Sequence, residues 1–419
     1  MLATVSDARN ELQETVRAHH GWALARLVRS IGDLQLAEDA LSRAIEAALV
    51  QWPQQGVPEA PRAWLVRTAR HKAIDELRRR DTWTRTRDEL ALLDALGDDD
   101  ARGDDAPLGD DMLRLLFTCC HPALAEDARV ALTLQVVGGL QADEIARAFL
   151  VPTATMAQRL VRAKRKIKHA GVPYRVPAAD EIDTRASGVR AVVYLIFNEG
   201  YAATHGDAWI RHDLCRHAIR VGEALCELLG DAETTALLAL MLLHAARHAT
   251  REDEHGDLVL LADQDRSRWD HPQIARATAL TTAALRQGPP GPYALQAAIA
   301  AVHANAGDAA DTDWRELVGL YDRLLAQVPS AVVALNRAVA IAHVAGPRDG
   351  LAAIDAITAR FGDALDDYFP LHAARADLLR RAGDVDDAIA AYRRARALCR
   401  NRAELRFLAR RLAELGADD

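Results

Sequence analysis

Between residues 153 and 168 the chain carries a run of side chains that can read and hold DNA. Glutamine and arginine match the hydrogen-bonding edges of bases in the major groove, and lysine and arginine bind backbone phosphates. No Asp or Glu interrupts residues 145–179, so this positive charge is not neutralised locally. The candidate DNA-contacting residues are Thr153, Thr155, Gln158, Arg159, Arg162, Arg165 and Lys166.

A second candidate surface for nucleic acid lies in residues 61–80, PRAWLVRTARHKAIDELRRR. Helical periodicity places an aromatic ring with cationic and hydrogen-bonding groups, opposite a core face. A ring can stack on an unpaired base while arginine holds the backbone, which suits opened DNA. The alternative is a tryptophan that only anchors the helix to its neighbour. The candidates are Trp64, Arg67, Arg70, His71, Asp75, Arg78 and Arg79.

Residues that could support catalysis or bind a metal are few and poorly arranged. His244 and His248 are four positions apart but lack the glutamate of an HExxH motif. His212, Cys215 and His217 have no CxxC partner that would complete a zinc site. We therefore expect no catalytic residue, no metal and no cofactor, and we expect these side chains to pack in helices or face solvent.

The first set of residues needs a helix-turn-helix to position it. Residues 141–149 predict a short helix, LVPT predicts a tight turn, and Thr153 is expected to cap a second helix. The apolar face of that second helix comprises Met156, Leu160, Ala163 and Ile167. A solvated basic helix is the ordinary alternative, but the short helix, the turn and the second helix together favour DNA binding.

Upstream, residues 31–53 predict an amphipathic helix that leaves Glu38, Asp39 and Glu46 exposed. A proline-containing loop separates it from the basic helix at 61–80. Residues 88–111 are strongly acidic and include glycine and proline, so part of this segment is predicted to be a flexible linker.

The composition predicts an all-α protein, because Ala, Leu and Arg dominate and strand-like alternation is rare. A length of 419 residues predicts two to four domains. The net charge of −8 does not itself indicate nucleic-acid binding, so the local charge pattern carries that inference. The five scattered cysteines, the lack of a signal-peptide pattern and the lack of a long apolar span lead us to expect a reduced, cytoplasmic protein without membrane contact.

In this order of elements the chain resembles the extracytoplasmic-function sigma factors of bacterial RNA polymerase. LAEDALSRAIEAALVQW looks like region 2.1–2.2, which docks on the β′ clamp helices, and PRAWLVRTARHKAIDELRRR looks like region 2.3–2.4, which melts and reads the −10 element. Residues 111–170 look like region 4, which reads the −35 element and touches the β flap. Many members have asparagine where this chain has His71. The core-polymerase-binding residues that the resemblance implies are Leu36, Asp39, Leu41, Ile45 and Trp52.

Residues 172–419 have no counterpart in a minimal sigma factor and resemble the long extension of one subgroup. RAVVYLIFNEGYAATHG, LMLLHAARHATR and LVLLADQDRSRWD look like its characteristic blocks. The tail repeats weakly at about the tetratricopeptide period, and the clearest unit has Gly383 at its turn with Ala388, Tyr392 and Ala395 at packing positions. An irregular helical array is the alternative.

The resemblance implies a helical bundle for region 2 at 1–86, an acidic linker at 87–110 and a helix-turn-helix domain at 111–171. A helical extension domain at 172–290 and tetratricopeptide-like repeats at 291–419 follow.

The aromatic-rich segment VYLIFNEGYAATHGD, residues 193–207, predicts a structural corner rather than an active site. Val192, Tyr194, Leu195 and Ile196 are expected on a buried helix face. The helix is expected to end at residues 198–200, with Gly200 free to take a positive φ. The interdomain or regulatory candidates are Asn198, Glu199, Tyr201, Asp263, Asp265, Arg268 and Trp269.

The function expected from the sequence is that of a sigma factor, not an enzyme. It would bind core RNA polymerase and promoter DNA and carry a regulatory extension, which could pack on the sigma domains or bind a regulatory protein or peptide. An operator-binding regulator with a helical sensing domain is the alternative. It leaves residues 31–80 unexplained and would be expected to bind palindromic sites as a dimer.

Overall fold

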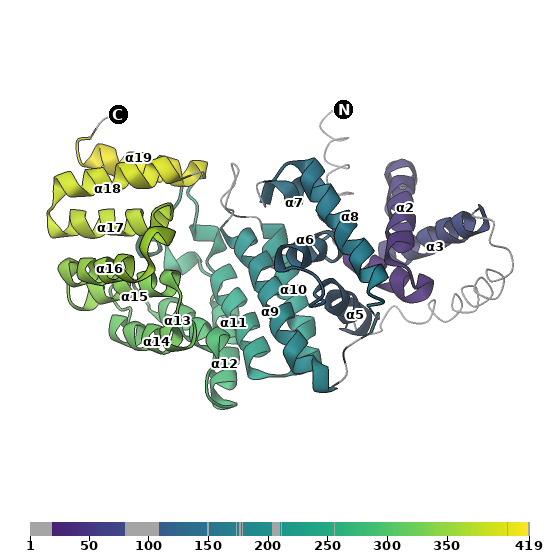
Figure 1. Ribbon diagram of the computed structural model, residues 1–419, viewed down its shortest axis with the longest axis horizontal. Coiled ribbons are helices and arrows are strands. Elements are labelled where there is room, and N and C mark those ends of the chain that lie inside the picture. The colour runs from purple at the N-terminus through teal and green to yellow at the C-terminus, as the bar shows by residue number, and fades with distance from the viewer. Residues whose placement is uncertain are drawn as a thin grey trace. The chain divides into compact units, whose positions relative to one another are not determined.

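The computed structural model describes residues 19–79, 109–148, 151–172, 174–175, 177, 179–202, 210, 212–254, 256–399 and 401–417. Within these ranges the regular elements are helices, and one isolated antiparallel bridge joins Glu252 and Leu258. The chain divides into two compact units, Met1–Ile196 and Phe197–Asp419. Figure 1 shows both as helical assemblies, so the all-α prediction is confirmed.

The first unit begins with helical residues 19–31, followed by α2 (Leu34–Gln55) and α3 (Pro61–Arg79). Asp33 caps α2 by accepting hydrogen bonds from the backbone N–H groups of Gln35 and Leu36, and Gly56 ends α2 with a φ of 84°. α2 and α3 pack against each other through small and aliphatic side chains. Those with no more than 8% exposure include Leu36, Ala40, Leu41, Ala44, Leu65, Ala69, Ala73 and Ile74.

Four further helices follow in this unit: α5 (Gly109–Cys119), α6 (Glu126–Val136), α7 (Ala142–Ala148) and α8 (Thr153–His169). Leu116 and Phe117 of α5 and Leu132 of α6 are fully buried in its core. The predicted helix-turn-helix is therefore formed by α7 and α8. Thr153 does not cap α8, because Pro152 holds the cap position and no side chain bonds to the first turn.

α9 (Ala179–Tyr201) passes from the first unit into the second. The sequence-based prediction for its end was wrong, because the helix continues through residues 198–200 to Tyr201. Gly200 lies outside the positive-φ glycines, and a Cβ added to it would come 2.8 Å from the backbone nitrogen of Cys215. Glycine is needed here for the close approach of the next helix. Leu195, expected to be buried, is 37% exposed.

The second unit starts with α10 (His212–Leu229), α11 (Ala232–Ala245) and α12 (His271–Arg286). Three single-turn helices follow α11: η2 (His248–Thr250), η3 (Leu261–Asp263) and η4 (Arg266–Arg268). α11 is buried on all sides along most of its length, from Ala236 to Leu243. It is therefore the central helix of this part of the fold.

Seven helices stack in order through the remainder of the second unit (Figure 1). They are α13 (Pro292–Asn305), α14 (Trp314–Gln327), α15 (Ala331–Val344), α16 (Pro347–Phe361), α17 (Phe369–Ala382), α18 (Val385–Leu398) and α19 (Arg402–Glu414). Gly383 ends α17 in the left-handed conformation, and Ala388, Tyr392 and Ala395 of α18 are buried. The turn and packing positions thus match those expected, while the tetratricopeptide class stays a prediction.

The last helix returns to an early loop of the same unit. Arg406 and Arg410 of α19 both form ion pairs with Asp257, which is 149 and 153 residues away in sequence. Ala403 packs in a small apolar cluster with Ile210 and Leu258. The array is therefore tied at its end to the beginning of its own unit.

Candidate nucleic-acid interface

α8 has one apolar face and one basic face, as the period of its sequence predicts. Met156, Leu160, Ala163 and Ile167 are at most 7% exposed. On the other side Thr153, Thr155, Gln158, Arg162, Arg165 and Lys166 are exposed. Arg159 is partly buried and lies 3.5 Å from the carboxylate of Asp127. The helix thus offers a continuous basic surface of the size that fits a DNA groove.

The exposed side of α3 is smaller than the sequence predicts. Arg67, His71 and Asp75 are exposed, whereas Arg70 is only 9% exposed and is removed from this surface by packing. The helix continues through Arg78 and Arg79, but their side chains lie outside the described residues.

Trp64 occupies an intermediate position at the base of α3. Its ring meets the ring of Trp52 edge-to-face, with centroids 5.3 Å apart, and Trp52 itself is 4% exposed. One edge of Trp64 therefore anchors α3 to α2, as the alternative interpretation of the sequence predicts. The side chain remains partly exposed, so its other edge is available to a base.

The surface of α2 differs from the predicted polymerase-binding set. Leu36, Leu41 and Trp52 are buried in the core of the unit, while Asp39 and Ile45 are partly exposed. The large apolar side chains that α2 presents to solvent are Leu49, at 39% exposure, and Val50, at 63%. The sequence-based set does not include them, although their apolar character outside the core face indicates exposed apolar side chains.

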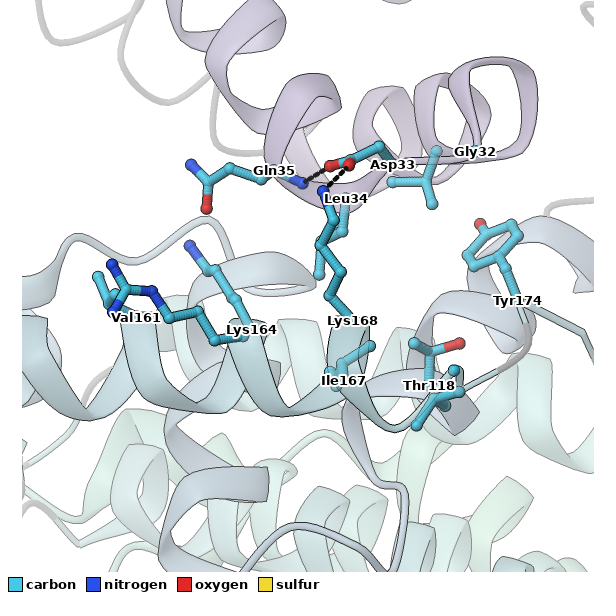
Figure 2. A pocket seen from close by; sticks show the side chains of 14 residues that line it. Gly32, Asp33, Leu34, Gln35, Thr118, Val161, Lys164, Ile167, Lys168 and Tyr174 are labelled. Carbon is cyan, nitrogen blue, oxygen red and sulfur yellow. Dashed lines mark hydrogen bonds and ion pairs between the residues drawn. The ribbon is translucent and has the colours of Figure 1, made fainter.

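One flank of α8 is bound to the start of α2. Lys164 lies 2.8 Å from Glu38, and both side chains are 13% exposed. Lys168 lies 2.7 Å from Asp33, the residue that caps α2 (Figure 2). Glu38 was expected to face solvent, and this expectation was wrong because α8 covers it. The exposed basic face of α8 is not used in these pairs.

Figure 2 shows the cavity of about 560 Å³ that lies between these two helices, lined in part by Lys164, Lys168 and Tyr174. The Tyr174 hydroxyl lies 2.9 Å from the carbonyl oxygens of both Ala25 and Asp111. The carboxylate of Asp111 in turn pairs with Arg26 at 3.2 Å. The part of this unit that contains α5–α8 is therefore packed directly on the part that contains α2 and α3.

Electrostatic effects at this packing surface follow from burial. The pKa of His20 is lowered to about 4, chiefly by burial. A hydrogen bond with the backbone of Val136 raises this pKa, and the charge of Lys164 lowers it. Burial also raises the pKa of Glu38, and the ammonium of Lys164 limits that rise. His20 is therefore neutral at physiological pH, and the ion pair with Lys164 favours the charged form of Glu38.

The predicted regulatory residues are divided between interior and surface. Tyr201 lies inside the second unit, where Arg247 donates a hydrogen bond to its hydroxyl at 2.8 Å. Trp269 is 4% exposed and donates from Nε1 to the hydroxyl of Thr250. The partly exposed candidates are Asn198 and Glu199, and the exposed ones are Asp263, Asp265 and Arg268. The structure therefore does not bring these seven residues together as one surface.

Within the described ranges, no three His, Cys, Asp or Glu side chains gather as a metal site. A search of the same residues finds no helix with the length and apolar character needed to cross a membrane.

Comparisons with known proteins identify both DNA-binding parts. Residues 15–82 match sigma-70 region 2, residues 114–167 match sigma-70 region 4, and residues 185–285 match a family of unknown function, DUF6596. An uncharacterized protein of Rhizobium meliloti (strain 1021) is 41% identical over 402 residues, covering 94% of each chain. No solved structure matches this chain. The chain belongs to the sigma-70 family of RNA polymerase sigma factors, as a member of the extracytoplasmic-function type with a C-terminal extension.

Proposed function

We propose that this sigma factor uses α8 to read the −35 element, α3 to open and read the −10 element, and α2 to bind core RNA polymerase. The observation that carries the proposal is the division of α8 into a buried apolar face and an exposed basic face. Two readers on one chain bind more tightly than either alone, because the second contact forms at a high effective concentration.

In the −35 interaction, Gln158, Arg162 and Arg165 contact base edges, and Lys166 contacts phosphate. Thr153 and Thr155 lie in the first turn of α8, where side chains and backbone N–H groups favour phosphate contacts. Arg159 must exchange its ion pair with Asp127 for a DNA contact, so its contribution is smaller than that of Arg162.

In the −10 interaction, Arg67 holds the backbone while His71, Asp75 and the open edge of Trp64 face bases taken from the stack. Arg70 positions α3 through packing and does not contact DNA in this arrangement.

The polymerase-binding surface consists of the outward side of α2. Asp39 and Ile45 contribute there together with the exposed Leu49 and Val50, and the partner surface is that of the β′ clamp helices. The buried Leu36, Leu41 and Trp52 act by holding the helix in place. Region 4 contacts the β flap. The chain has no catalysis of its own in this proposal and acts in the cytoplasm, where polymerase and the chromosome meet.

The test is transcription with purified core polymerase of the same organism on its genomic DNA. We expect initiation at a defined set of promoters that depends on the protein. Initiation at no specific site would contradict the proposal. A footprint of two inverted half-sites without polymerase would support the operator-binding alternative instead.

For the C-terminal extension we propose regulation of these activities in cis. Support comes from α9, which belongs to both units, and from Arg185 of α9, which donates a hydrogen bond to the carbonyl of Phe117 at 2.7 Å. Such a helix can transmit a change in the second unit to region 4.

A truncated chain tests this regulation. The cut belongs after residue 201, because a cut near residue 175 would remove α9 from region 4. Higher promoter-specific transcription by residues 1–201 than by the full chain would indicate inhibition, and lower transcription would indicate that the extension is required. Equal transcription would contradict regulation in cis.

A further inference from the structure

A cluster of arginine, histidine and aromatic side chains lies inside the second unit, where α9 and α11 end. Arg251 places its guanidinium 3.5 Å from the ring centroid of Tyr201 and donates a hydrogen bond to the Tyr201 carbonyl. Arg247 donates to the hydroxyl of the same tyrosine at 2.8 Å. The two arginines are 5% and 8% exposed, so two like charges are withdrawn from water around one ring.

Arg247 is held by neutral groups rather than by a carboxylate. Its Nη2 bonds to the Tyr201 hydroxyl and lies 3.0 Å from Nδ1 of His244, and its guanidinium lies 5.8 Å from the ring centroid of Trp269. The hydrogen bonds of its guanidinium within the described residues are those of Nη2 to Tyr201 and His244. A guanidinium carries five N–H donors, so Arg247 retains donors for a further acceptor.

His248 provides a second incomplete polar group near Tyr201. Its Nε2 is buried and has no hydrogen-bond partner in the described part of the chain. Its ring lies 6.0 Å from that of Tyr201 and 5.1 Å from that of His212, which is exposed. The incomplete group therefore lies near the Tyr201 ring and near a histidine that reaches solvent.

The local field favours a negative charge in this position. Burial, followed by the charges of His212, Arg251 and Arg247, lowers the pKa of His248 to about 3. Burial, followed by the charges of Arg247 and Arg251, also lowers the pKa of His244 well below its ordinary value. Both rings are thus kept neutral mainly by burial, and nearby positive charge, which an anion would offset, adds to this effect.

We propose that Arg247, Arg251 and His248 form a binding site for the oxyanion group, phosphate or carboxylate, of a small molecule. The anion accepts from the free N–H groups of Arg247 and from His248 Nε2, and Tyr201 holds both guanidiniums in place. Charge-assisted hydrogen bonds of this kind are the strong class in proteins. The site goes beyond the sigma-factor function, because binding at it needs neither polymerase nor DNA.

The experiment measures the melting temperature and the heat of binding of the full-length protein with added anions. The probes are inorganic phosphate and succinate, each compared with chloride at equal ionic strength and pH. We expect one of the probes to raise the melting temperature progressively with concentration, as selective binding to the folded state requires. A larger effect of phosphate assigns the site to phosphorylated ligands, and a larger effect of succinate assigns it to carboxylates.

Two substitutions locate the binding. Arg247→Gln and His248→Ala should each raise the Kd for the effective probe about tenfold or more, because each removes a donor to a charged acceptor. His248→Ala removes no hydrogen bond seen at Nε2, so it remains a usable variant if Arg247→Gln does not fold. Arg216→Gln is the matched control, since this arginine lies exposed on neighbouring α10.

The proposal is overturned if neither phosphate nor succinate shifts the melting temperature beyond chloride. It is equally overturned if Arg247→Gln and His248→Ala keep the affinity of Arg216→Gln. Neither result affects the sigma-factor assignment, because promoter-specific transcription is measured separately.

Discussion

At the scale of single residues, exposure separates the side chains that can contact DNA from those that share their chemistry. Arg67 and Arg70 lie three positions apart on α3, yet only Arg67 is exposed. On α8, Arg162 is exposed and bears no ion pair within the described residues, whereas Arg159 is drawn to Asp127. The contribution of an arginine to DNA recognition therefore depends on its exposure and on the protein contacts that it must break to reach DNA.

Arg162→Ala should weaken recognition of the −35 element by about 1–3 kcal/mol, the cost of losing one good base contact. The measurement is open-complex formation with core polymerase on the cognate promoter. On a promoter whose −35 bases are already replaced, wild type and variant should differ little. An equal loss on both promoters would mean that Arg162 contacts phosphate only.

At the scale of elements, the sides of α8 have different environments. Its outward face is largely exposed, its inner face packs on α6 and α7, and its flank holds α2 through Lys164 and Lys168. The two lysines are not equivalent, because the side chain of Lys164 is 13% exposed and that of Lys168 is 72% exposed. Breaking a largely buried ion pair lowers the free energy of unfolding more than breaking an exposed one.

Lys164→Met should lower the free energy of unfolding of the first unit by about 3 kcal/mol, because it leaves Glu38 buried without a compensating charge. Lys168→Met is the control and should cost no more than about 1 kcal/mol, as for an exposed pair. Chemical denaturation of the full chain at neutral pH measures both. Since the pKa of Glu38 is already raised by burial, the Lys164→Met loss should shrink as the pH falls and Glu38 takes up a proton. Equal effects of the two variants would show that burial does not strengthen the Lys164 pair.

At the scale of the whole molecule, both units keep histidines neutral by burial. In the first unit burial lowers the pKa of His20 to about 4, and in the second it lowers the pKa of His303 to about 4 and of His248 to about 3. A lowered folded-state pKa means that the unfolded chain binds more protons below about pH 6.5. The stability of each unit should therefore be fully present above that pH and decline as the pH falls towards 4.

His20→Gln isolates this effect in the first unit. Between pH 6.5 and 4 the variant should lose less stability than the wild type, because it no longer has a buried group that protonates only on unfolding. Glu38 acts in the opposite direction over part of this range, since its raised pKa makes stability fall as the pH rises, but it is common to both proteins. Denaturant titrations at several pH values measure the difference.

Features that depend on local order along the chain can be predicted from the amino-acid sequence. The two faces of α8 follow from helical period, the order of region 2 and region 4 follows from their motifs, and the turn at Gly383 follows from the conformational freedom of glycine. Each of these can be read from residues within a few turns of one another.

Which helix faces are covered depends on the packing of distant segments and could not be predicted from the sequence. This packing buried Glu38 under α8, withdrew Arg70 from the surface of α3, exposed Leu195 and made Gly200 a point of close helix contact. Lys168 and Asp33 lie 135 residues apart, so no local pattern could have paired them. Burial and ion pairing depend on the neighbour that the fold brings to a surface, and that neighbour comes from a distant part of the chain.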